Sequence, residues 1–332
     1  MQRKYKAGAG LRTVKEGSPS STKSGTGLII AIALIGAATL FSCANKKIEA
    51  PARDINLPEY ATYTEGETPF DGDLQVIAFN IERGFFWEDV ASYIKDRREE
   101  YPATLVLLTE LDRLHSRTGD IFVADLLARE LDMNMVYVTE FVEYNDQTPE
   151  NQGDHGNAIL SPWPLSDVTV IRHKTMFDWS RFGQLQGEPR YGDRVTIGAT
   201  IELTGGKQVR AYTVHLESNA DTIGKWIQMR EILKDAKGYD LPVVIGGDFN
   251  ELPGWLMFWM FPFYHIENTF RGDFSGTGHC KPDGDRAKCG LKIDWIVHRG
   301  MDVKERSVDY PLNSEGGIIS DHAPVRAVFE VD

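Results

Sequence analysis

The chain has 332 residues, of which 42% are hydrophobic and 11% aromatic, and its formal net charge at pH 7 is −13. This length and apolar content are enough to bury a large core, so the chain beyond its first stretch is not intrinsically disordered. The acidic total disfavours long duplex DNA as a partner, because Lys and Arg contacts to phosphate supply most non-specific affinity for DNA. A local basic cleft remains compatible with that total.

The first 42 residues have the order of a bacterial secretory signal. An uncharged apolar run over residues 27–40 follows six Lys and Arg side chains and a single Glu. The run is shorter than the about 20 residues that span a bilayer. The run ends at Leu40-Phe41-Ser42-Cys43, which resembles the lipobox of bacterial lipoproteins, where the thiol is acylated and the preceding segment is removed. We therefore expect residues 1–42 to be a lipoprotein signal peptide and Cys43 to carry the lipid. The protein would then lie in the cell envelope, on its periplasmic or outer face. A plain anchor helix and an ordinary secretory signal are the alternatives.

Acylation of Cys43 would leave two cysteines, Cys280 and Cys289, in a polar loop. A close pair of cysteines in an oxidising compartment usually forms a disulfide. A zinc site is the alternative, but it needs about four nitrogen or sulfur ligands, and only His279 lies nearby in the sequence. We predict the disulfide.

Residues 43–70 are polar and lack a clear hydrophobic period, so they are predicted to form a tether, and residues 71–332 a single domain. In that domain, apolar runs and alternation predict strands, while apolar residues at i, i+3, i+4 and i+7 predict helices. The strands are expected at residues 74–79, 104–109, 135–141, 157–161, 164–171, 195–203, 207–216, 242–247, 292–298 and 324–331, and the helices at 87–94, 124–131 and after 221. Segments 157–161 and 164–171 are expected to pair with each other, and a Gly-containing turn predicts a hairpin of 195–203 with 207–216.

Polar side chains follow or interrupt these strands near their ends. All are of types that bind metal ions or move protons, and they are Asn80, Glu110, His215, Asp248, Asn250, Asp294 and the triplet Ser320-Asp321-His322. Because ligands of α/β sheets bind just outside the carboxyl ends of the strands, we expect these side chains to share one site.

Seven segments resemble, in the same order, the motifs of the endonuclease/exonuclease/phosphatase family. They are FNIERG, LTELD, GNAILS, VHLES, GGDFN, KIDWIV and SDHAPV, and the resemblance extends over residues 74–329. It implies an α/β fold, a four-layer α/β sandwich in which two mixed β-sheets pack face to face with helices outside. The match to the inositol polyphosphate 5-phosphatase branch is poor, because Glu251-Leu252 follows GDFN.

The resemblance also implies a metal site. Mg²⁺ prefers hard oxygen ligands and keeps several waters, so one or two carboxylates suffice to hold it. Glu110 is the first choice as metal ligand, with Asn80 as an amide-oxygen partner and Asp321 completing or extending the site. The expected cofactor is Mg²⁺, with Mn²⁺ as an alternative.

The catalytic roles follow the same family pattern. His322 is expected to act on the nucleophilic water or the phosphate, with Asp294 fixing its tautomer. Asp248 would position the water or protonate the leaving oxygen, and Asn250 and His215 would donate hydrogen bonds to the phosphoryl oxygens. Asn157 and Arg190 are also expected to bind substrate, and Arg194 could clamp phosphate together with Arg190. A turn residue is an equally plausible interpretation of Asn157, and a solvated loop of the two arginines.

The sequence thus predicts a metal-dependent phosphoester hydrolase, a phosphodiesterase acting on a small or lipid-borne substrate in the cell envelope. An extracellular or periplasmic nuclease and a non-catalytic phospholigand-binding protein are the alternatives, and a monomer is expected. Residues 255–264 (WLMFWMFPFY) are either a core helix under the site or an exposed ridge suited to lipid.

Overall fold

The structure is a computed structural model that describes residues 48–65, 68–144, 153–252, 256–284 and 286–331. The predicted signal peptide and Cys43 lie outside these residues. None of the helices in the described ranges is both long enough and apolar enough to cross a membrane.

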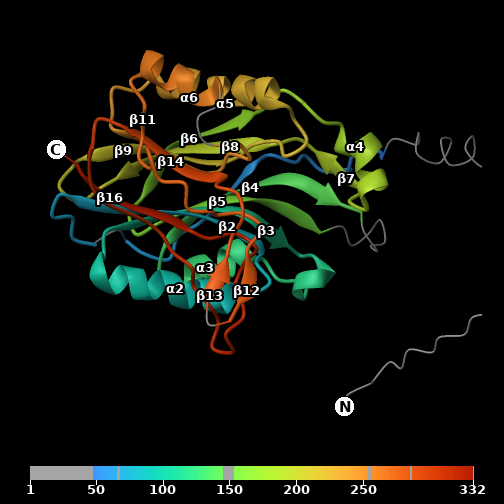
Figure 1. The fold of residues 1–332 in the computed structure, drawn as a ribbon, viewed down its shortest axis with the longest axis horizontal. Helices are drawn as coiled ribbons and strands as arrows, with labels where there is room; N and C mark the ends of the chain where they lie inside the picture. Colours follow the sequence, from blue (N-terminus) through green and yellow to red (C-terminus); the bar gives the residue numbers. More distant parts are fainter. Residues whose placement is uncertain (1–47, 66–67, 145–152, 253–255, 285, 332) are drawn as a thin grey trace, which may run out of the picture. The chain divides into compact units, whose positions relative to one another are not determined.

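The described residues contain two large β-sheets (Figure 1). The first consists, in spatial order, of β1 (Pro58–Ala61), β4 (Asn134–Glu143), β5 (Asp154–Ser161), β3 (Thr104–Arg113), β2 (Asp73–Arg83), β16 (Val325–Glu330) and β15 (Asp302–Val308), and β7 (Arg190–Gly192) also pairs with β4. The second consists of β11 (Glu267–Asn268), β14 (Asp294–Arg299), β10 (Val243–Asp248), β9 (Gln208–His215), β8 (Val195–Glu202) and β6 (Leu165–Arg172). Both sheets are mixed, since β2–β3 and β9–β10 are parallel whereas the other pairs are antiparallel.

Helices cover the outer face of each sheet (Figure 1). On the first sheet lie α2 (Trp87–Glu100) and α3 (Val123–Glu130), and on the second lie α5 (Thr222–Ala236) and α6 (Leu256–Met260). Asp221 begins α5 as its N-cap, because its carboxylate accepts the Gly224 N–H at 2.8 Å. The remaining elements are short: α4 (Trp179–Phe182), the 3₁₀ turns η1 (Ser116–Thr118), η2 (Gly183–Gln186) and η3 (Phe261–Tyr264), and the hairpin β12 (Lys281–Asp283) with β13 (Arg286–Lys288). The predicted four-layer α/β sandwich is confirmed.

The inner faces of the two sheets meet in one core. Side chains of both sheets, such as Val76 and Leu107 of the first and Ile197 and Ile245 of the second, are fully buried in it. The sheets approach most closely at Gly246, where a Cβ atom would lie 2.9 Å from Leu107 Cδ1 and 3.0 Å from Ala78 Cβ. A larger residue at this position would push the layers apart directly beneath Asp248.

Two predictions about the chain's organisation are wrong. The segment predicted as a tether contains β1, which pairs with β4 through Pro58↔Val138 and Ala61↔Met135, so the folded domain begins well before residue 71. Segments 157–161 and 164–171 do not pair with each other, because β5 joins the first sheet whereas β6 joins the second. The short link Pro162-Trp163-Pro164 between the two strands suggests a hairpin, but here the chain changes sheets.

The described part of the aromatic segment, residues 256–264, combines both interpretations given to the segment. Met257 and Phe261 are buried in the core, whereas Trp259 and Phe263 are 74% and 81% exposed. The inward residues hold α6 and η3 against the second sheet, and the outward ones line a pocket together with Trp226 and Arg230 of α5.

Candidate active site

Three site residues lie in neighbouring positions at one end of the second sheet. Asp248, the last residue of β10, is in register with His215, the last residue of β9, and with Asp294, the first residue of β14. All three side chains are buried. Strand β9 runs parallel to β10, so their last residues lie at the same edge of the sheet. Strand β14 runs antiparallel to β10, so its first residue lies at that edge too. The three residues therefore converge although the sequence separates them widely.

The first sheet supplies the facing residues through two irregularities. The β2–β3 register shifts between Asn80 and Arg83, and Glu82 and Arg83 have positive φ angles of 46° and 69°. Glu110 also has a positive φ, 59°, where the β3–β5 register shifts. Bulges of this kind redirect side chains, and left-handed backbone at non-glycine residues concentrates at functional sites. Here they bring Arg83 Nη1 to 3.1 Å from Glu110 Oε2.

His322 and Asp294 form a hydrogen-bonded pair across the two sheets. His322 Nδ1 lies 2.9 Å from Asp294 Oδ2. Because the ring donates from Nδ1 to this carboxylate, Nε2 faces the site, 3.9 Å from Asp248 Oδ2. Burial alone would lower the pKa of His322, but Asp294 and then Asp248 raise this pKa well above its ordinary value. The pair therefore holds a fixed imidazolium at the centre of the site.

His215 is held in the opposite charge state. Its Nδ1 lies 2.8 Å from Arg194 Nη1, and since a guanidinium only donates, Nδ1 must accept and Nε2 must carry the proton. Burial, with Arg194 next, lowers the pKa of His215 well below its ordinary value. The Nε2–H group of this neutral ring faces Asp248 Oδ2 at 3.5 Å and Glu110 Oε1 at 3.8 Å.

Asp248 is the point on which these groups converge. Asn250 donates its backbone N–H to Asp248 Oδ1 at 2.7 Å, and its side-chain amide lies 3.3 Å from Oδ2. The Asn80 amide also lies 3.4 Å from Oδ2. Burial, followed by repulsion from Asp294, raises the pKa of Asp248 to about 7. A carboxyl group with this pKa can both hold and release a proton near neutral pH.

A group of carboxylates beside this centre fits a divalent cation. Burial raises the pKa of Glu82, and repulsion from Asp321 raises it further. Burial also raises the pKa of Asp321, and repulsion from Glu110 adds to that rise. Glu110 itself is different: burial opposes its ionisation, but the Arg83 guanidinium holds the pKa of Glu110 well below the usual range. Mutual repulsion among three half-buried acids is relieved by a bound cation, and carboxylate oxygens are the ligands that Mg²⁺ and Mn²⁺ prefer.

Two geometric clusters of potential metal ligands are present in the described residues. Glu110, His155 and His215 form one, and Asp248, Asp294 and His322 form the other, with ligand atoms within 4.8 Å of one another in each. Arg83 Nη1 lies 2.8 Å from His155 Nε2 in the first cluster, so a guanidinium already faces that ring. Glu110 is therefore better placed to bind a cation with the neighbouring acids than with His155.

Two predicted substrate contacts lie behind the site instead. Asn157 is fully buried, and its amide donates to Glu140 Oε1 and the Val195 carbonyl at 2.9 and 3.1 Å. Arg190 is 3% exposed, its guanidinium lies 3.5 Å from the Trp179 ring centroid, and it pairs with Glu188 at 3.1 Å. Neither side chain is open to a ligand in this structure, so both are better described as supports of the wall than as substrate contacts.

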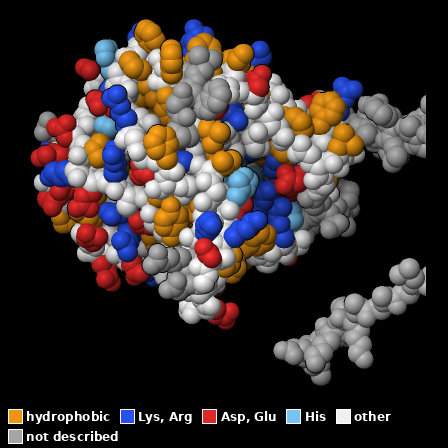
Figure 2. Space-filling view, in the orientation of Figure 1, with side chains coloured by type: hydrophobic (Ala, Val, Ile, Leu, Met, Phe, Trp, Pro, Cys, Tyr) orange, Lys and Arg blue, Asp and Glu red, His pale blue; other side chains and the backbone are white. Residues whose placement is uncertain are grey.

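Sequence reasoning gave Arg194 a different role, that of a phosphate clamp, and it missed Glu82 and Arg83, which also shape the site. Arg194 connects His215 with Glu140, whose Oε2 lies 3.0 Å from Arg194 Nη1. Arg83 pairs with Glu110, and Glu82 accepts the Asp321 N–H at 2.9 Å. Glu82 and Arg83 lie in the same FNIERG motif as Asn80, so their position was an available signal. Figure 2 shows the result on the surface, where basic side chains gather beside histidine on the drawn face of an acidic protein.

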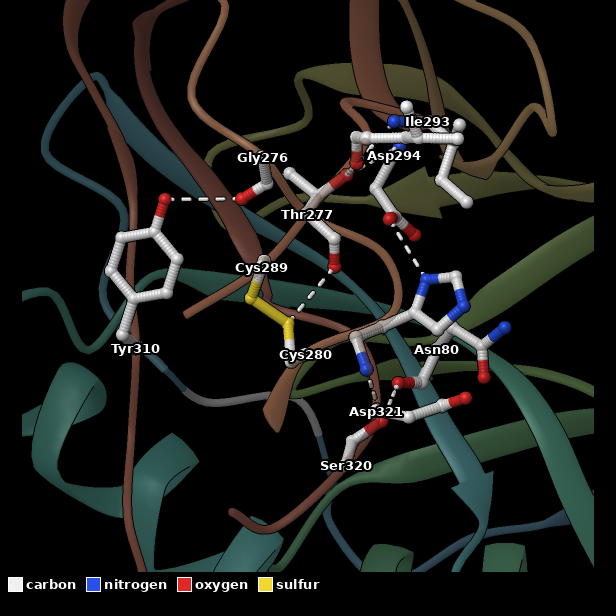
Figure 3. The surroundings of a disulfide bond; sticks show 12 residues. Asn80, Gly276, Thr277, Cys280, Cys289, Ile293, Asp294, Tyr310, Ser320 and Asp321 are labelled. Atoms are coloured by element: carbon white, nitrogen blue, oxygen red, sulfur yellow. Dashed lines mark hydrogen bonds and ion pairs between the residues drawn. A yellow bond between two sulfur atoms is a disulfide. The ribbon is translucent and has the colours of Figure 1, made fainter. Parts of the chain in front are cut away.

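Thr277 is a further missed residue, and it positions both members of the His322–Asp294 pair (Figure 3). Its hydroxyl oxygen accepts the backbone N–H groups of Ile293 and Asp294 at 3.0 and 2.9 Å. Its carbonyl accepts the Ala323 N–H at 2.7 Å, one residue after His322. One side chain thereby fixes the start of β14, and its backbone fixes the loop that carries the histidine.

The predicted disulfide between Cys280 and Cys289 is confirmed and closes the β12–β13 hairpin next to Thr277 (Figure 3). The Cys280 N–H donates to the Asp321 carbonyl at 2.7 Å. The covalent link therefore belongs to the loop that supports the Asp321-His322 segment.

Replacing Thr277 by Val keeps the volume but removes the hydroxyl acceptor from two buried N–H groups. We expect a loss of about 1–3 kcal/mol in the free energy of unfolding and a lower kcat with little change in KM, because Asp294 moves relative to His322. Thr277→Ser, which restores the hydroxyl, should recover most of the lost free energy of unfolding and most of the lost kcat. Chemical denaturation and steady-state kinetics measure these effects, and a Ser variant as poor as the Val variant would contradict the assigned role of the hydroxyl.

The chain belongs to the endonuclease/exonuclease/phosphatase family, since the model of that family matches residues 77–322. Members of this family are typically phosphoester hydrolases, and the geometry above agrees with that class. A comparison with curated proteins finds no match.

Several solved structures have the same fold as this chain. An endonuclease/exonuclease/phosphatase from Beutenbergia cavernae is 19% identical with a TM-score of 0.55, and the match covers 78% of this chain and 72% of that one. The human nocturnin catalytic domain is 16% identical with a TM-score of 0.54, over 82% and 96% of the two chains. A mannosyl-6-phosphatase from Bacteroides thetaiotaomicron is 14% identical with a TM-score of 0.52, over 76% and 98%. At these identities the likeness concerns the fold alone.

Proposed function

We propose that the protein is a Mg²⁺-dependent phosphodiesterase, with Mn²⁺ as an alternative metal, that acts on a small or lipid-borne substrate in the cell envelope. The observation that carries this proposal is the convergence on Asp248 Oδ2 of two imidazole Nε2 atoms in opposite charge states, at 3.5 Å from His215 and 3.9 Å from His322. A purely structural acid does not need two differently protonated rings directed at one oxygen.

The metal would be held by Glu110, with Asn80 and Asp321 adding oxygen ligands. Glu82, which lies in the same group of carboxylates, would orient or extend this set. When bound, a divalent cation neutralises negative charge that develops on the phosphoryl oxygens.

The chain's own residues would bind the phosphoester and move protons. The His322 imidazolium, fixed by Asp294, presents Nε2–H to a phosphoryl oxygen. The His215 Nε2–H and the Asn250 amide would donate to the other phosphoryl oxygens. Asp248 Oδ2 would hold the proton that leaves the attacking water or that the leaving oxygen requires, consistent with its raised pKa.

The proposed location and substrate rest on the sequence. The lipobox at Cys43 supports an envelope protein held at a membrane, and the acidic total supports a substrate other than long duplex DNA. The basic side chains beside the site are paired with acids such as Glu110, Glu140 and Glu188, so they add positive charge locally without making the protein cationic.

Metal-dependent product release tests this proposal. Hydrolysis of bis(p-nitrophenyl) phosphate should be abolished by excess EDTA and restored by Mg²⁺ or Mn²⁺. The same protein should then be tested on phospholipid, sugar phosphate and plasmid DNA substrates at about 0.15 M salt. Activity that persists in excess EDTA would exclude the metal mechanism. Plasmid cleavage without hydrolysis of small or lipid-borne diesters would favour a nuclease, and binding of phosphorylated ligands without product release would favour a non-catalytic phospholigand-binding protein.

A further inference from the structure

The chain enters the folded domain beside α4, only a few residues after Cys43. The Ile48 N–H donates to the Ser180 carbonyl at 2.9 Å, and the Tyr144 hydroxyl donates to the Glu49 carbonyl at 3.0 Å. Contacts to the domain are therefore in place from Ile48 onward, and the segment predicted as a tether is largely part of the fold. What remains between a lipid-bearing Cys43 and the domain is residues 44–47.

Such a short connection limits how far the domain can move from a bilayer. An extended chain spans at most about 3.6 Å per residue, so Ile48 stays within roughly 18 Å of Cys43. A lipid on Cys43 places that residue at the headgroup level. The surface next to Ile48 and Ser180 is therefore the one that a membrane reaches first.

That surface has the composition of a membrane-contacting segment. Leu185 is 69% exposed and Phe182 is 40% exposed, and the Phe177 ring packs against Phe182 with a centroid distance of 5.8 Å. Arg181 is exposed and lies 5.1 Å from the Phe182 ring centroid, and Lys174 is exposed nearby in the sequence. Aromatic and aliphatic side chains with adjacent cations suit the boundary between water and anionic headgroups. These residues, Lys174, Phe177, Arg181, Phe182 and Leu185, are named the α4 surface.

We infer that the α4 surface contacts a phospholipid bilayer with anionic headgroups and holds the rim of the active site against it. This inference rests on the proposed acylation of Cys43. Charge complementarity supports the choice of occupant, since exposed cations flank the apolar side chains although the whole protein is acidic.

The α4 surface is connected to the catalytic residues through a few direct contacts. Glu188 follows η2, its N–H donates to the Gly183 carbonyl at 2.9 Å, and its carboxylate pairs with Arg83 at 3.5 Å. Arg83 in turn pairs with Glu110 at 3.1 Å. From the same segment, Trp179 donates its indole N–H to Glu217 at 2.8 Å. A lipid-borne phosphoester would therefore meet the protein at the edge of the site, and the substrate would not need to leave the membrane.

A second exposed aromatic surface serves as an internal control. Trp259 and Phe263 are more exposed than Phe182, but they lie on α6 and η3, which cover the outer face of the second sheet, whereas α4 lies next to β7 of the first sheet (Figure 1). Ile48 has its backbone hydrogen bond to α4. If exposure alone decided membrane contact, Trp259 and Phe263 would be the residues that insert into the bilayer.

Site-specific fluorescence on the full, lipidated chain tests the inference. Leu185→Cys and the control Phe263→Cys would each be labelled with an environment-sensitive dye, since Cys43 is acylated in the proposed form and Cys280 is bonded to Cys289. Both proteins would be reconstituted into vesicles of phosphatidylethanolamine and phosphatidylglycerol. Nitroxide-bearing lipids should quench the dye at residue 185 several-fold more than at residue 263. Equal or stronger quenching at residue 263, or no quenching at either position, would overturn the inference.

Companion measurements separate the failure of this inference from that of the proposed function. Hydrolysis of bis(p-nitrophenyl) phosphate in the same vesicles reports the chemistry alone, so its absence would refute the enzyme and not the docking surface. A mature N-terminus without lipid would overturn the docking argument and leave the enzyme intact. A dye at residue 185 that is shielded from aqueous iodide but not quenched by nitroxide lipids would indicate a protein partner, which would also overturn it.

The double variant Phe182→Ser/Leu185→Ser gives a functional readout. It should lower hydrolysis of a vesicle-borne phosphodiester several-fold and leave hydrolysis of the soluble diester unchanged. Trp259→Ser/Phe263→Ser should leave both rates near wild type. If only Trp259→Ser/Phe263→Ser lost hydrolysis of the vesicle-borne diester, the assignment of the α4 surface as the membrane contact would be contradicted.

Discussion

Glu110→Gln is expected to lower kcat/KM by roughly a thousandfold, because a metal ion contributes several kcal/mol of charge stabilisation at the transition state. The substitution keeps the size of the side chain and can keep a hydrogen bond to Arg83, which lies 3.1 Å from the carboxylate. It removes the one carboxylate of the group whose pKa lies well below the usual range and which is therefore charged throughout the working pH range. Steady-state kinetics and calorimetric titration with Mg²⁺ measure the effect.

Glu188→Gln is the matched control for this change. Glu188 also pairs with Arg83, at 3.5 Å, but it is more exposed than Glu110 and lies on the rim of the site. The control should retain most activity and an unchanged affinity for Mg²⁺. If both variants lost activity equally, the effect would come from the shared Arg83 contact, and Glu110 would not be the metal ligand.

Residues at the ends of strands were the part of the site that the sequence predicted well. His215, Asp248 and Asp294 come together because β9, β10 and β14 are neighbours with these residues in register. An apolar strand pattern followed by a polar residue carries that information locally. The order of the family motifs supplied the neighbour relations that local patterns do not contain.

The supporting network could not be predicted in the same way. Arg194 connects His215 to Glu140, which requires knowing that strands of different sheets face each other. Arg83 reaches Glu110 only because of a bulge and two left-handed residues, Glu82 and Arg83 itself. No periodicity encodes a bulge, so its consequence for side-chain direction appears only in three dimensions.

The incorrect predictions have the same origin. The GNAILS motif predicts a substrate contact for Asn157, and the positive charge of Arg190 predicts a phosphate clamp. In the fold, Asn157 is fully buried with its amide donated to Glu140, and Arg190 packs on Trp179, so neither side chain faces a ligand in this structure. The tether was misjudged because β1 is a short edge strand, and a strand of four residues has too few side chains for alternation to be visible.

His322→Ala and Asp294→Ala are each expected to lower kcat by about 10²–10⁴-fold, the usual contribution of a positioned acid or base. His322→Ala removes the imidazolium itself, whereas Asp294→Ala removes the carboxylate that fixes the ring through the 2.9 Å hydrogen bond from Nδ1. Because the two side chains act as one unit, the double variant should be barely worse than the worse single variant. His265→Ala, an exposed histidine at the end of η3, should retain wild-type activity and controls for the loss of an imidazole.

The cycle is informative only if the variants fold, so circular dichroism and thermal unfolding accompany the kinetics. Asp294 is fully buried, so its truncation leaves a small cavity. Its Oδ1 has no hydrogen-bond partner among the described residues, so no donor to Oδ1 loses its acceptor. Two penalties that multiply in the double variant would mean that Asp294 stabilises something other than the orientation of His322. Asp248, whose pKa Asp294 raises, would then be the next residue to test as its functional partner.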